Sequence, residues 1–373
     1  MTDSSGGAGV NKLETISPKQ ISVLFFTFMT GSSIINIPAP LIGKAENGAW
    51  LSLLISGAIG MMLLGCMLYL HARFPDKSFV EYSQKLIGVW LTLAISVLPL
   101  SFMLHMLTAI VLDIALFMKS SMLRETPTYA FTSLIYMVSA LTVRAGLEVM
   151  ARMFTIIMIL VVFFVTAVLL LAIENYNPGN LLPFMSQGIK PVLNGAFFSF
   201  GFPYAEVFLF AMLLHFTRKQ ERSGLNRNML LSLFMNIITL CISTSCTIML
   251  FGPLAGIKKY SLYELARTVD VQEIITRIES VIGISLIAGS YMKTTITLYV
   301  LCLYVTHLFK LKDYRTLVMP FAMIAFLNTL VGFKSDMQWV EIVSIVHPLW
   351  VAFAYAAPLL LITAVAAFRS STN

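Results

Sequence analysis

Charged residues are scarce in this chain of 373 residues. Asp, Glu, Lys and Arg make up 12% of the sequence, whereas apolar residues make up 58%. Soluble globular domains carry about 25% charged residues, so this scarcity excludes an ordinary soluble enzyme or a nucleic-acid-binding domain. The composition predicts an all-α polytopic membrane protein. We interpret the net charge of +7 as an inner surface that faces anionic membrane lipid.

The sequence also has little that would bind a metal ion or form a disulfide. All four cysteines, Cys66, Cys241, Cys246 and Cys302, lie inside apolar runs, and the five histidines are scattered along the chain. Disulfide frameworks and metal sites both need ligands at suitable spacings. We therefore expect no disulfide, no metal, no cofactor and no enzymatic activity.

The first 19 residues are polar and contain no basic stretch leading into a short apolar core. A cleaved signal peptide is therefore not expected. Residues 1–19 are interpreted as a cytoplasmic N-terminal segment.

Ten apolar runs follow, and most reach the length of about 20 residues that a membrane-spanning helix needs. They lie at about 20–42, 49–70, 90–118, 127–143, 153–173, 192–214, 228–252, 280–308, 316–333 and 339–368. We expect residues 20–368 to form a single membrane domain of ten spans. Its two halves would cover about 20–173 and 192–368.

The placement of Lys and Arg predicts the orientation of these spans. With the N-terminus inside, fifteen of these residues fall on inner segments and nine on outer segments, and Lys293 lies within a span. Positive residues favour the cytoplasmic side, so both termini are expected there. The outer side would then carry the long loop 253–279, a candidate lid or partner contact, and the amphipathic stretch 78–87 would lie along the inner interface.

Two spans are interrupted at corresponding positions of the two halves. The first contains Gly31, Ser32 and Ser33, and the sixth contains the motif Phe200-Gly201-Phe202-Pro203-Tyr204. Pro203 lacks an N–H, so the sixth helix should break near Phe200. Interrupted spans of this kind are the best sequence indication of a transporter-type binding site.

The breaks predict a site for a small amino-acid-like nutrient. Free N–H groups after the first break favour a carboxylate, and the carbonyls and aromatic rings of the second favour an ammonium group and an apolar wall. The alternative is that Gly, Ser and Pro only pack helix against helix. The candidate ligand-binding residues are Gly31, Ser32, Ser33, Phe200, Gly201, Phe202, Tyr204 and Tyr291.

Lys293 is a lysine far from either end of the eighth span. Such a charge costs about 2.5–3.5 kcal/mol on insertion scales, so it should face the interior and have a partner. We predict a role in ion or proton coupling for Lys293 with Glu206 and Thr294. The alternatives are a structural ion pair or a side chain that reaches the interface. Asp113, near the outer end of the third span, is interpreted as an interfacial residue.

Several motifs in order along the chain resemble one family. They are Ile16-Ser17-Pro18-Lys19-Gln20, Glu81-Tyr82 before Gly88, Arg144-Ala145-Gly146-Leu147-Glu148, Asn180-Leu181-Leu182-Pro183, Phe202-Pro203-Tyr204-Ala205-Glu206 and Arg277-Ile278-Glu279 before Lys293. The chain resembles the B-subunit (GerAB-like) permeases of spore germinant receptors, in the amino acid–polyamine–organocation superfamily. It departs from them at Tyr204-Ala205, where a Gly is expected beside the Glu.

The resemblance implies a LeuT-like fold of two inverted five-helix repeats, with helices 1 and 6 broken. It also implies a place in the spore inner membrane beside A- and C-type receptor subunits, and a nutrient-sensing role that triggers germination and ion release. The alternative function is an ion-coupled amino acid transporter. A purely structural subunit is a third possibility.

Overall fold

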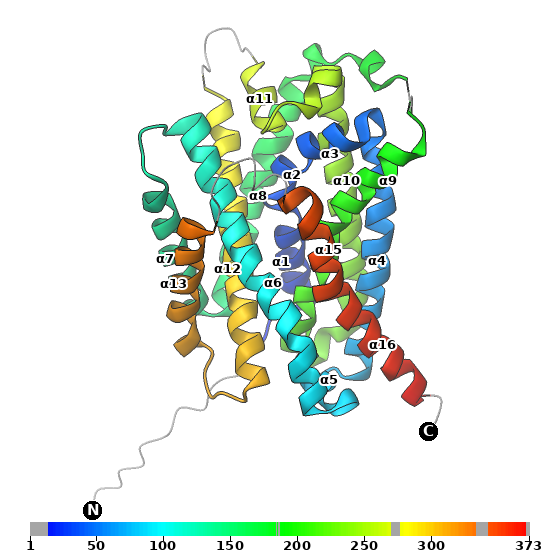
Figure 1. Cartoon of the computed structure of the whole chain (residues 1–373), viewed down its shortest axis with the longest axis vertical. Coiled ribbons are helices and arrows are strands. Elements are labelled where there is room, and N and C mark those ends of the chain that lie inside the picture. The colour runs from blue at the N-terminus through cyan, green and yellow to red at the C-terminus, as the bar shows by residue number, and fades with distance from the viewer. Residues whose placement is uncertain (1–13, 184, 186, 270–276, 333–341, 371–373) are drawn as a thin grey trace, which may run out of the picture.

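The computed structural model describes residues 14–183, 185, 187–269, 277–332 and 342–370, which form one elongated helical bundle (Figure 1). Its α-helices are α1 (Pro18–Thr30), α2 (Ser33–Asn36), α3 (Pro38–Ala45), α4 (Ala49–Arg73), α5 (Phe79–Ile87), α6 (Val89–Phe117), α7 (Thr128–Ala145), α8 (Leu147–Leu171), α9 (Ile189–Gly201), α10 (Leu225–Phe251), α11 (Ser261–Arg267), α12 (Glu279–Leu308), α13 (Arg315–Val331), α15 (His347–Val351) and α16 (Ala357–Ser370). The prediction of an all-α fold is confirmed.

Seven helical stretches in the described part of the chain are long and apolar enough to cross a membrane. They are 38–73, 89–122, 147–171, 189–212, 225–251, 279–308 and 347–369, and Arg315–Val331 is a shorter apolar helix. Each of the ten predicted spans overlaps a helical region, but the count of ten stays a prediction. Among the spans whose predicted start lies within the described residues, the fifth differs most, because α8 begins at Leu147 and not near residue 153.

Local sequence signals explain where several helices begin. The Ser17 hydroxyl accepts a hydrogen bond from the Gln20 N–H, the Gln20 side-chain oxygen accepts one from the Ser17 N–H, and Pro18 occupies the first turn. This is a capping box, in which two otherwise unpaired backbone donors are satisfied. Ser78 and Glu81 form the same arrangement at the start of α5, so the predicted amphipathic stretch is a helix.

Two glycines make the sharp corners between consecutive helices. Gly88 joins α5 to α6 with φ 86°, and Gly146 joins α7 to α8 with φ 98°. Residues with a Cβ rarely adopt such angles. At Gly146 the space is also occupied, because an added Cβ would lie 2.5 Å from a carboxylate oxygen of Glu14.

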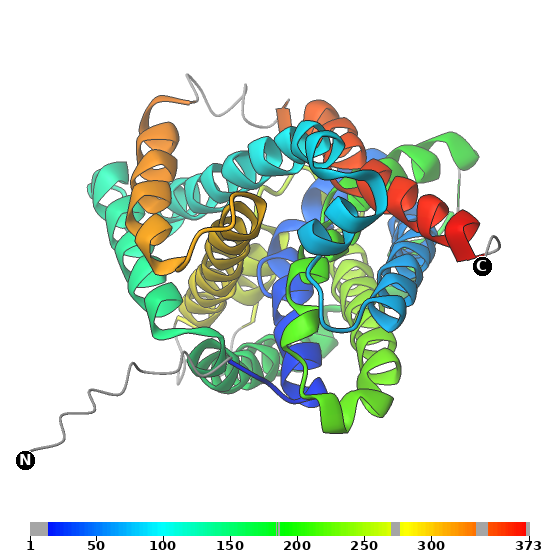
Figure 2. The ribbon, with the colours of Figure 1, turned by 90° about the horizontal axis from the view of Figure 1, so that it is seen from below.

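Helices α1 and α12 occupy the interior of the bundle, whereas α7, α13 and α16 lie toward its edge (Figure 2). The apolar window of α12 is 83% buried, against 28% for that of α8. The buried polar residues of α12 explain its interior position, because lipid offers no hydrogen-bond partners to polar groups. They are Ser285, Ser290, Lys293, Thr294, Thr295, Thr297 and Thr306.

Both predicted breaks are present. The sixth span leaves the α-helix at Phe202 (φ −146°, ψ 112°) and continues as a 3₁₀ segment, η5 (Tyr204–Met212). The break therefore falls two residues beyond the predicted position, directly before Pro203.

The break in the first span is milder than the one in the sixth. Gly31 and Ser32 keep helical dihedral angles between α1 and α2. Within the described residues, however, no backbone acceptor bonds the N–H groups of the four residues 32–35. The first span thus presents free donors without an extended segment.

The segments predicted to share one face of the membrane lie at the same end of the bundle. Helix α5, the C-terminal end of α12 and the C-terminal end of α16 are at the bottom of Figure 1, and α11 is at the top. Which end faces the cytoplasm stays a prediction. Of the candidate lid at 253–279, residues 270–276 lie outside the described residues, and the remainder contains α11.

Candidate functional site

A cavity of about 150 Å³ lies between the two broken spans. Cavities of this size hold a benzene-sized guest, so the volume suits a compact nutrient. The lining residues are Ser32, Asn36, Pro40, Met106, Ala109, Ile110, Asp113, Phe198, Phe202, Glu206, Lys259, Tyr260, Ser290 and His347. They come from the first span, α6, both sides of the sixth-span break, the outer loop, α12 and α15.

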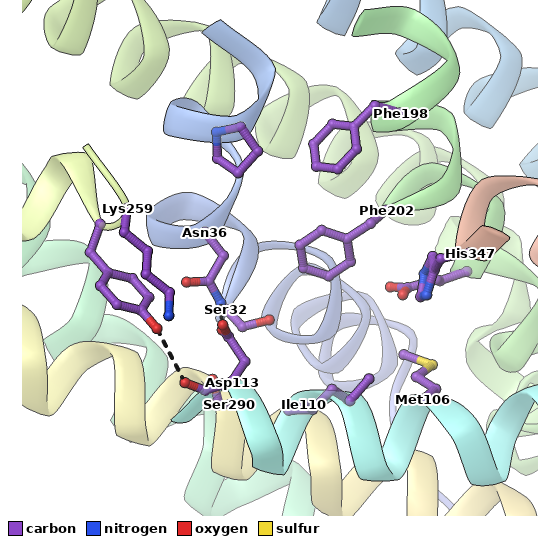
Figure 3. Close-up of a pocket in the computed structure, with 14 residues that line it drawn as sticks. Ser32, Asn36, Met106, Ile110, Asp113, Phe198, Phe202, Lys259, Ser290 and His347 are labelled. Carbon is purple, nitrogen blue, oxygen red and sulfur yellow. Dashed lines mark hydrogen bonds between the residues drawn. The ribbon is translucent and has the colours of Figure 1, made fainter. Parts of the chain in front are cut away.

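The cavity has a polar side and an aromatic side. Figure 3 shows Ser32, Asn36 and Asp113 together on one side, with Phe198, Phe202 and His347 on the other. A ligand with a charged end and an apolar end would place each against matching protein groups. Pockets for small molecules commonly combine apolar walls with a few placed polar groups.

Two unpartnered hydroxyls lie on the wall of the cavity. Ser32 and Ser290 are 2% and 1% exposed, and neither hydroxyl has a hydrogen-bond partner among the described residues. Buried polar groups are nearly always paired in folded proteins. Together with the free N–H groups that begin at Ser32, these hydroxyls form a donor set suited to a carboxylate.

The wall formed by α6 carries a carboxylate. Asn36 donates a hydrogen bond from Nδ2 to Asp113 Oδ2 at 2.5 Å, and the Tyr260 hydroxyl donates to the Asp113 carbonyl at 3.4 Å. Asp113 therefore points into the cavity. The Asp113 side chain thus has a place in the cavity wall that the sequence did not indicate, and its closeness to the membrane surface stays a prediction.

Lys293 and Glu206 form a buried ion pair beside the cavity. Lys293 Nζ lies 2.5 Å from Glu206 Oε2, and the two side chains are 0% and 1% exposed. The ammonium also lies 4.0 Å from the centroid of the Phe202 ring and 5.1 Å from that of Phe28. The expectation that Lys293 has an interior partner is confirmed. Its role in coupling stays a prediction.

This ion pair reaches the cavity through Glu206, which lines the wall, while Lys293 lies behind it. Thr294, the third residue of the predicted coupling set, is buried and its hydroxyl has no partner among the described residues. Ser33 is also buried, and its hydroxyl likewise has no hydrogen-bond partner among the described residues. Both are close in sequence to cavity residues, but neither is part of the lining.

The two glycines predicted to face the ligand lie against protein backbone instead. A Cβ at Gly31 would be 3.0 Å from the Cα and carbonyl oxygen of Gly289 on α12. A Cβ at Gly201 would be 2.7 Å from the Pro348 Cα on α15. Both glycines permit a close contact between helices. Neither glycine lines this cavity, so their predicted role in ligand binding stays a prediction.

Three aromatic residues of the predicted site are also absent from the cavity lining. Tyr204 packs against Gly60 of α4, and the Tyr291 hydroxyl lies 2.7 Å from that of Thr142 on α7. Phe200 is partly buried against the hydrophobic core. Of the eight predicted ligand residues, Ser32 and Phe202 line the cavity.

The structure adds residues to the site that the sequence did not indicate. Asn36, His347 and Phe198 are the clearest. On α6, a signal was available: Met106, Ile110 and Asp113 recur at helical spacing, which places them on one face.

At the opposite end of the bundle, Glu14 ties several elements together. Its carboxylate accepts a hydrogen bond from the Leu147 N–H at 2.7 Å and lies 3.5 Å from Arg315, and the Tyr314 hydroxyl donates to it at 3.4 Å. A second cavity of about 540 Å³ adjoins this cluster. Within the described residues, no group of His, Cys, Asp and Glu is arranged to hold a metal ion.

Solved transporter structures share the fold. The chain matches a Na⁺-coupled sialic acid symporter (TM-score 0.68, 11% identity, 91% of this chain and 78% of that one). It also matches the nucleobase-cation-symport-1 family transporter MHP1 (TM-score 0.68, 10% identity, 96% and 94%) and MhsT in complex with L-phenylalanine (TM-score 0.65, 11% identity, 94% and 98%). These likenesses confirm the LeuT-like fold.

Sequence relatives are more specific. Spore germination protein KB of Bacillus subtilis (strain 168) is 25% identical over 309 residues, 82% of each chain, and YndE of the same strain is 23% identical over 181 residues, 48% of this chain and 50% of the relative. The model of the family described as spore germination protein (Spore_permease) matches residues 15–336. This chain therefore belongs to the spore germination protein family of membrane permeases.

Proposed function

We propose that the protein is the nutrient-sensing membrane subunit of a spore germinant receptor, and that a small amino-acid-like germinant binds in the cavity between the broken spans. The observation that carries this proposal is the set of unpartnered donors at Ser32 and Ser290, which face an aromatic wall at Phe198 and Phe202. Family membership supports the germination role.

The Lys293–Glu206 pair supplies a route from ligand binding to a response. Glu206 follows the sixth-span break directly and lines the cavity, while Lys293 lies on the interior helix α12. A ligand that favours one position of Glu206 shifts the balance between two arrangements of these elements, because binding shifts an equilibrium by its differential affinity. In this proposal the shift triggers germination and ion release.

A second candidate function is ion-coupled amino acid transport. It is favoured by the likeness of the fold to a Na⁺-coupled symporter and to MhsT, which was solved in complex with L-phenylalanine. Uptake of radiolabelled amino acids into vesicles that contain this chain alone separates the two functions. Accumulation above that of empty vesicles supports the transporter, whereas saturable binding without accumulation supports the sensor.

The proposed receptor also requires A- and C-type partner subunits and a location in the spore inner membrane. Affinity purification of the tagged chain from spore inner membranes tests both. Recovery of the two partner subunits supports the receptor, and recovery of the chain without them contradicts it.

Ligand binding is tested by thermal unfolding of the purified full chain with each proteinogenic L-amino acid. A bound ligand stabilises the folded state by RT ln(1 + [L]/Kd), which is about 2.7 kcal/mol at one hundred times Kd. We expect a concentration-dependent rise in melting temperature for one or a few compact amino acids. Ser32→Val fills the donor end of the cavity and should abolish the rise. The control Ser101→Val changes a half-buried serine on α6 whose hydroxyl bonds only its own helix, to the Leu98 carbonyl, and should retain the rise.

A further inference from the structure

The two carboxylates that line the cavity are not equivalent. Glu206 has a cationic partner, since Lys293 lies 2.5 Å away. For Asp113, no Lys or Arg in the described part of the chain lies within ion-pair distance, and the hydrogen bond to its side chain comes from the neutral amide of Asn36. The exposed Lys259 at the cavity mouth adds a longer-range attraction only.

This imbalance leaves Asp113 without a cation in direct contact, since Lys259 lines the same cavity but lies beyond ion-pair distance. A carboxylate withdrawn from water is costly unless a cation or several hydrogen bonds compensate it. Ionisable groups inside a membrane protein are, by default, functional for this reason. A cationic group in the cavity would complete the site at Asp113.

The groups around Asp113 suit an ammonium ion. The Asn36 amide nitrogen is engaged by the carboxylate, and its Oδ1 is buried with no hydrogen-bond partner among the described residues. An amide oxygen and a carboxylate oxygen are both acceptors, and an ammonium group has three donors.

The position of Asn36 relative to Ser32 indicates the size of the ligand. The two residues are four apart on the first span, which corresponds to about 6 Å along a helix axis. Free N–H donors begin at Ser32, while the acceptors lie at Asn36 and Asp113. Donors and acceptors one helical turn apart match the carboxylate and ammonium groups of a compact zwitterion, whose side chain would point to Phe198 and Phe202.

We propose that Asp113, held in place by Asn36, binds the ammonium group of the ligand and thereby selects α-amino acids over their deaminated acids. This inference deepens the proposed function and rests on it. It differs from the sequence-based expectation, in which the carbonyls of the sixth-span break would receive the ammonium group. It assigns to α6 a recognition role separate from the Lys293–Glu206 pair.

The experiment uses the purified full chain and measures binding by thermal unfolding. Each proteinogenic L-amino acid is compared with the carboxylic acid that lacks its amino group, for example L-alanine with propionate. A hydrogen-bonded contact to a charged group is worth about 1.5–3 kcal/mol, so Asp113→Asn should weaken amino-acid binding roughly 10- to 100-fold. Binding of the deaminated acids should be weak for the wild type and unchanged by the substitution.

Two controls accompany Asp113→Asn. Glu264→Gln removes an acid on α11 that pairs with Arg267 outside the cavity, and should bind as the wild type does. Asp113→Glu keeps the charge but moves it, and should bind amino acids more tightly than Asp113→Asn. Melting without ligand shows that each variant is folded.

The outcomes separate this inference from the proposed function. Equal amino-acid affinity for the wild type and Asp113→Asn overturns the ammonium site and leaves the function standing, as does equal binding of propionate and L-alanine by the wild type. Stabilisation by NaCl over choline chloride that disappears in Asp113→Asn would make Asp113 an inorganic cation site instead. If no amino acid stabilises the wild type, the proposed function and this inference both fail.

Discussion

The contact between Gly31 and Gly289 brings α1 and α12 together without any side chain between them. A Cβ at Gly289 would lie 2.1 Å from the Gly31 carbonyl oxygen and 2.3 Å from its carbonyl carbon. An ordinary contact between carbon and oxygen is about 3.3 Å or longer. Gly289→Ala therefore forces the two helices apart by about 1 Å, because both neighbours are backbone atoms that cannot rotate away.

The expected loss of stability follows from two opposing effects. Overpacking an interior costs about 1–3 kcal/mol. Alanine gains up to about 1 kcal/mol over glycine in a helix interior, so we expect a net destabilisation of about 1–2 kcal/mol for Gly289→Ala. Gly31→Ala should destabilise the protein less than Gly289→Ala does, because a Cβ at Gly31 would lie 3.0 Å from the nearest atoms of Gly289.

Gly65→Ala is the matched control for these substitutions. Gly65 lies within α4, and an added Cβ would meet no atom within 4 Å. It should therefore leave abundance and melting temperature unchanged or slightly raised. The assay is membrane abundance and apparent melting temperature of the three variants and the wild type, at one heating rate because membrane-protein unfolding is often irreversible.

The ranking decides between two roles for Gly31. A packing role predicts that stability falls in the order Gly65→Ala, Gly31→Ala, Gly289→Ala. A role in ligand contact predicts normal abundance for Gly31→Ala, with its response shifted to higher nutrient concentration. If Gly289→Ala melts at the same temperature as Gly65→Ala, the close contact does not limit the packing and the reasoning is refuted.

Three further predictions follow from other parts of the structure. Lys293→Met or Glu206→Gln alone should destabilise by about 3–5 kcal/mol, because one buried charge loses its partner, and the double variant should recover part of the loss; equal melting of single and double variants would contradict this. A cysteine at Lys258 should react with an impermeant reagent from the non-cytoplasmic side only, and labelling from the cytoplasm would reverse the orientation. Burial raises the pKa of Glu81, but hydrogen bonds with His307 and Ser78 outweigh it and lower the pKa to about 2. The unfolded-state pKa of a Glu is about 4.3, so the folded-state pKa of Glu81 is depressed, and its stabilisation is present above about pH 4.3 and is lost toward pH 2. The difference in melting temperature between the wild type and Glu81→Gln should therefore shrink as the pH falls over this range. A difference that stays constant would refute the prediction.

Part of the site could be predicted from local chemistry. Pro203 breaks the sixth span because it has no N–H, and this holds whatever surrounds it. Lys293 needs an interior partner because an isolated charge at membrane depth is costly, and Glu206 is that partner. Both predictions depend on single residues and the membrane alone.

The direction in which side chains point could not be predicted in the same way. In a soluble helix, apolar periodicity separates the buried face from the exposed one. In a membrane the lipid-facing residues are as apolar as the interior, so that period is weak. This is why Tyr291 was assigned to the ligand although it bonds Thr142 on α7, and why the contact of Asp113 with Asn36 was not predicted.

The sequence by itself determined the membrane class, the helical architecture and the two breaks, because hydropathy and proline chemistry act along the chain. Only the tertiary structure decided what the breaks face. Gly31 and Gly201 meet Gly289 and Pro348, residues far away in the chain, and the cavity is closed by α6, α15 and the outer loop. Such contacts depend on the mutual rotation of packed helices, which the pattern of apolar residues in a membrane protein leaves unspecified.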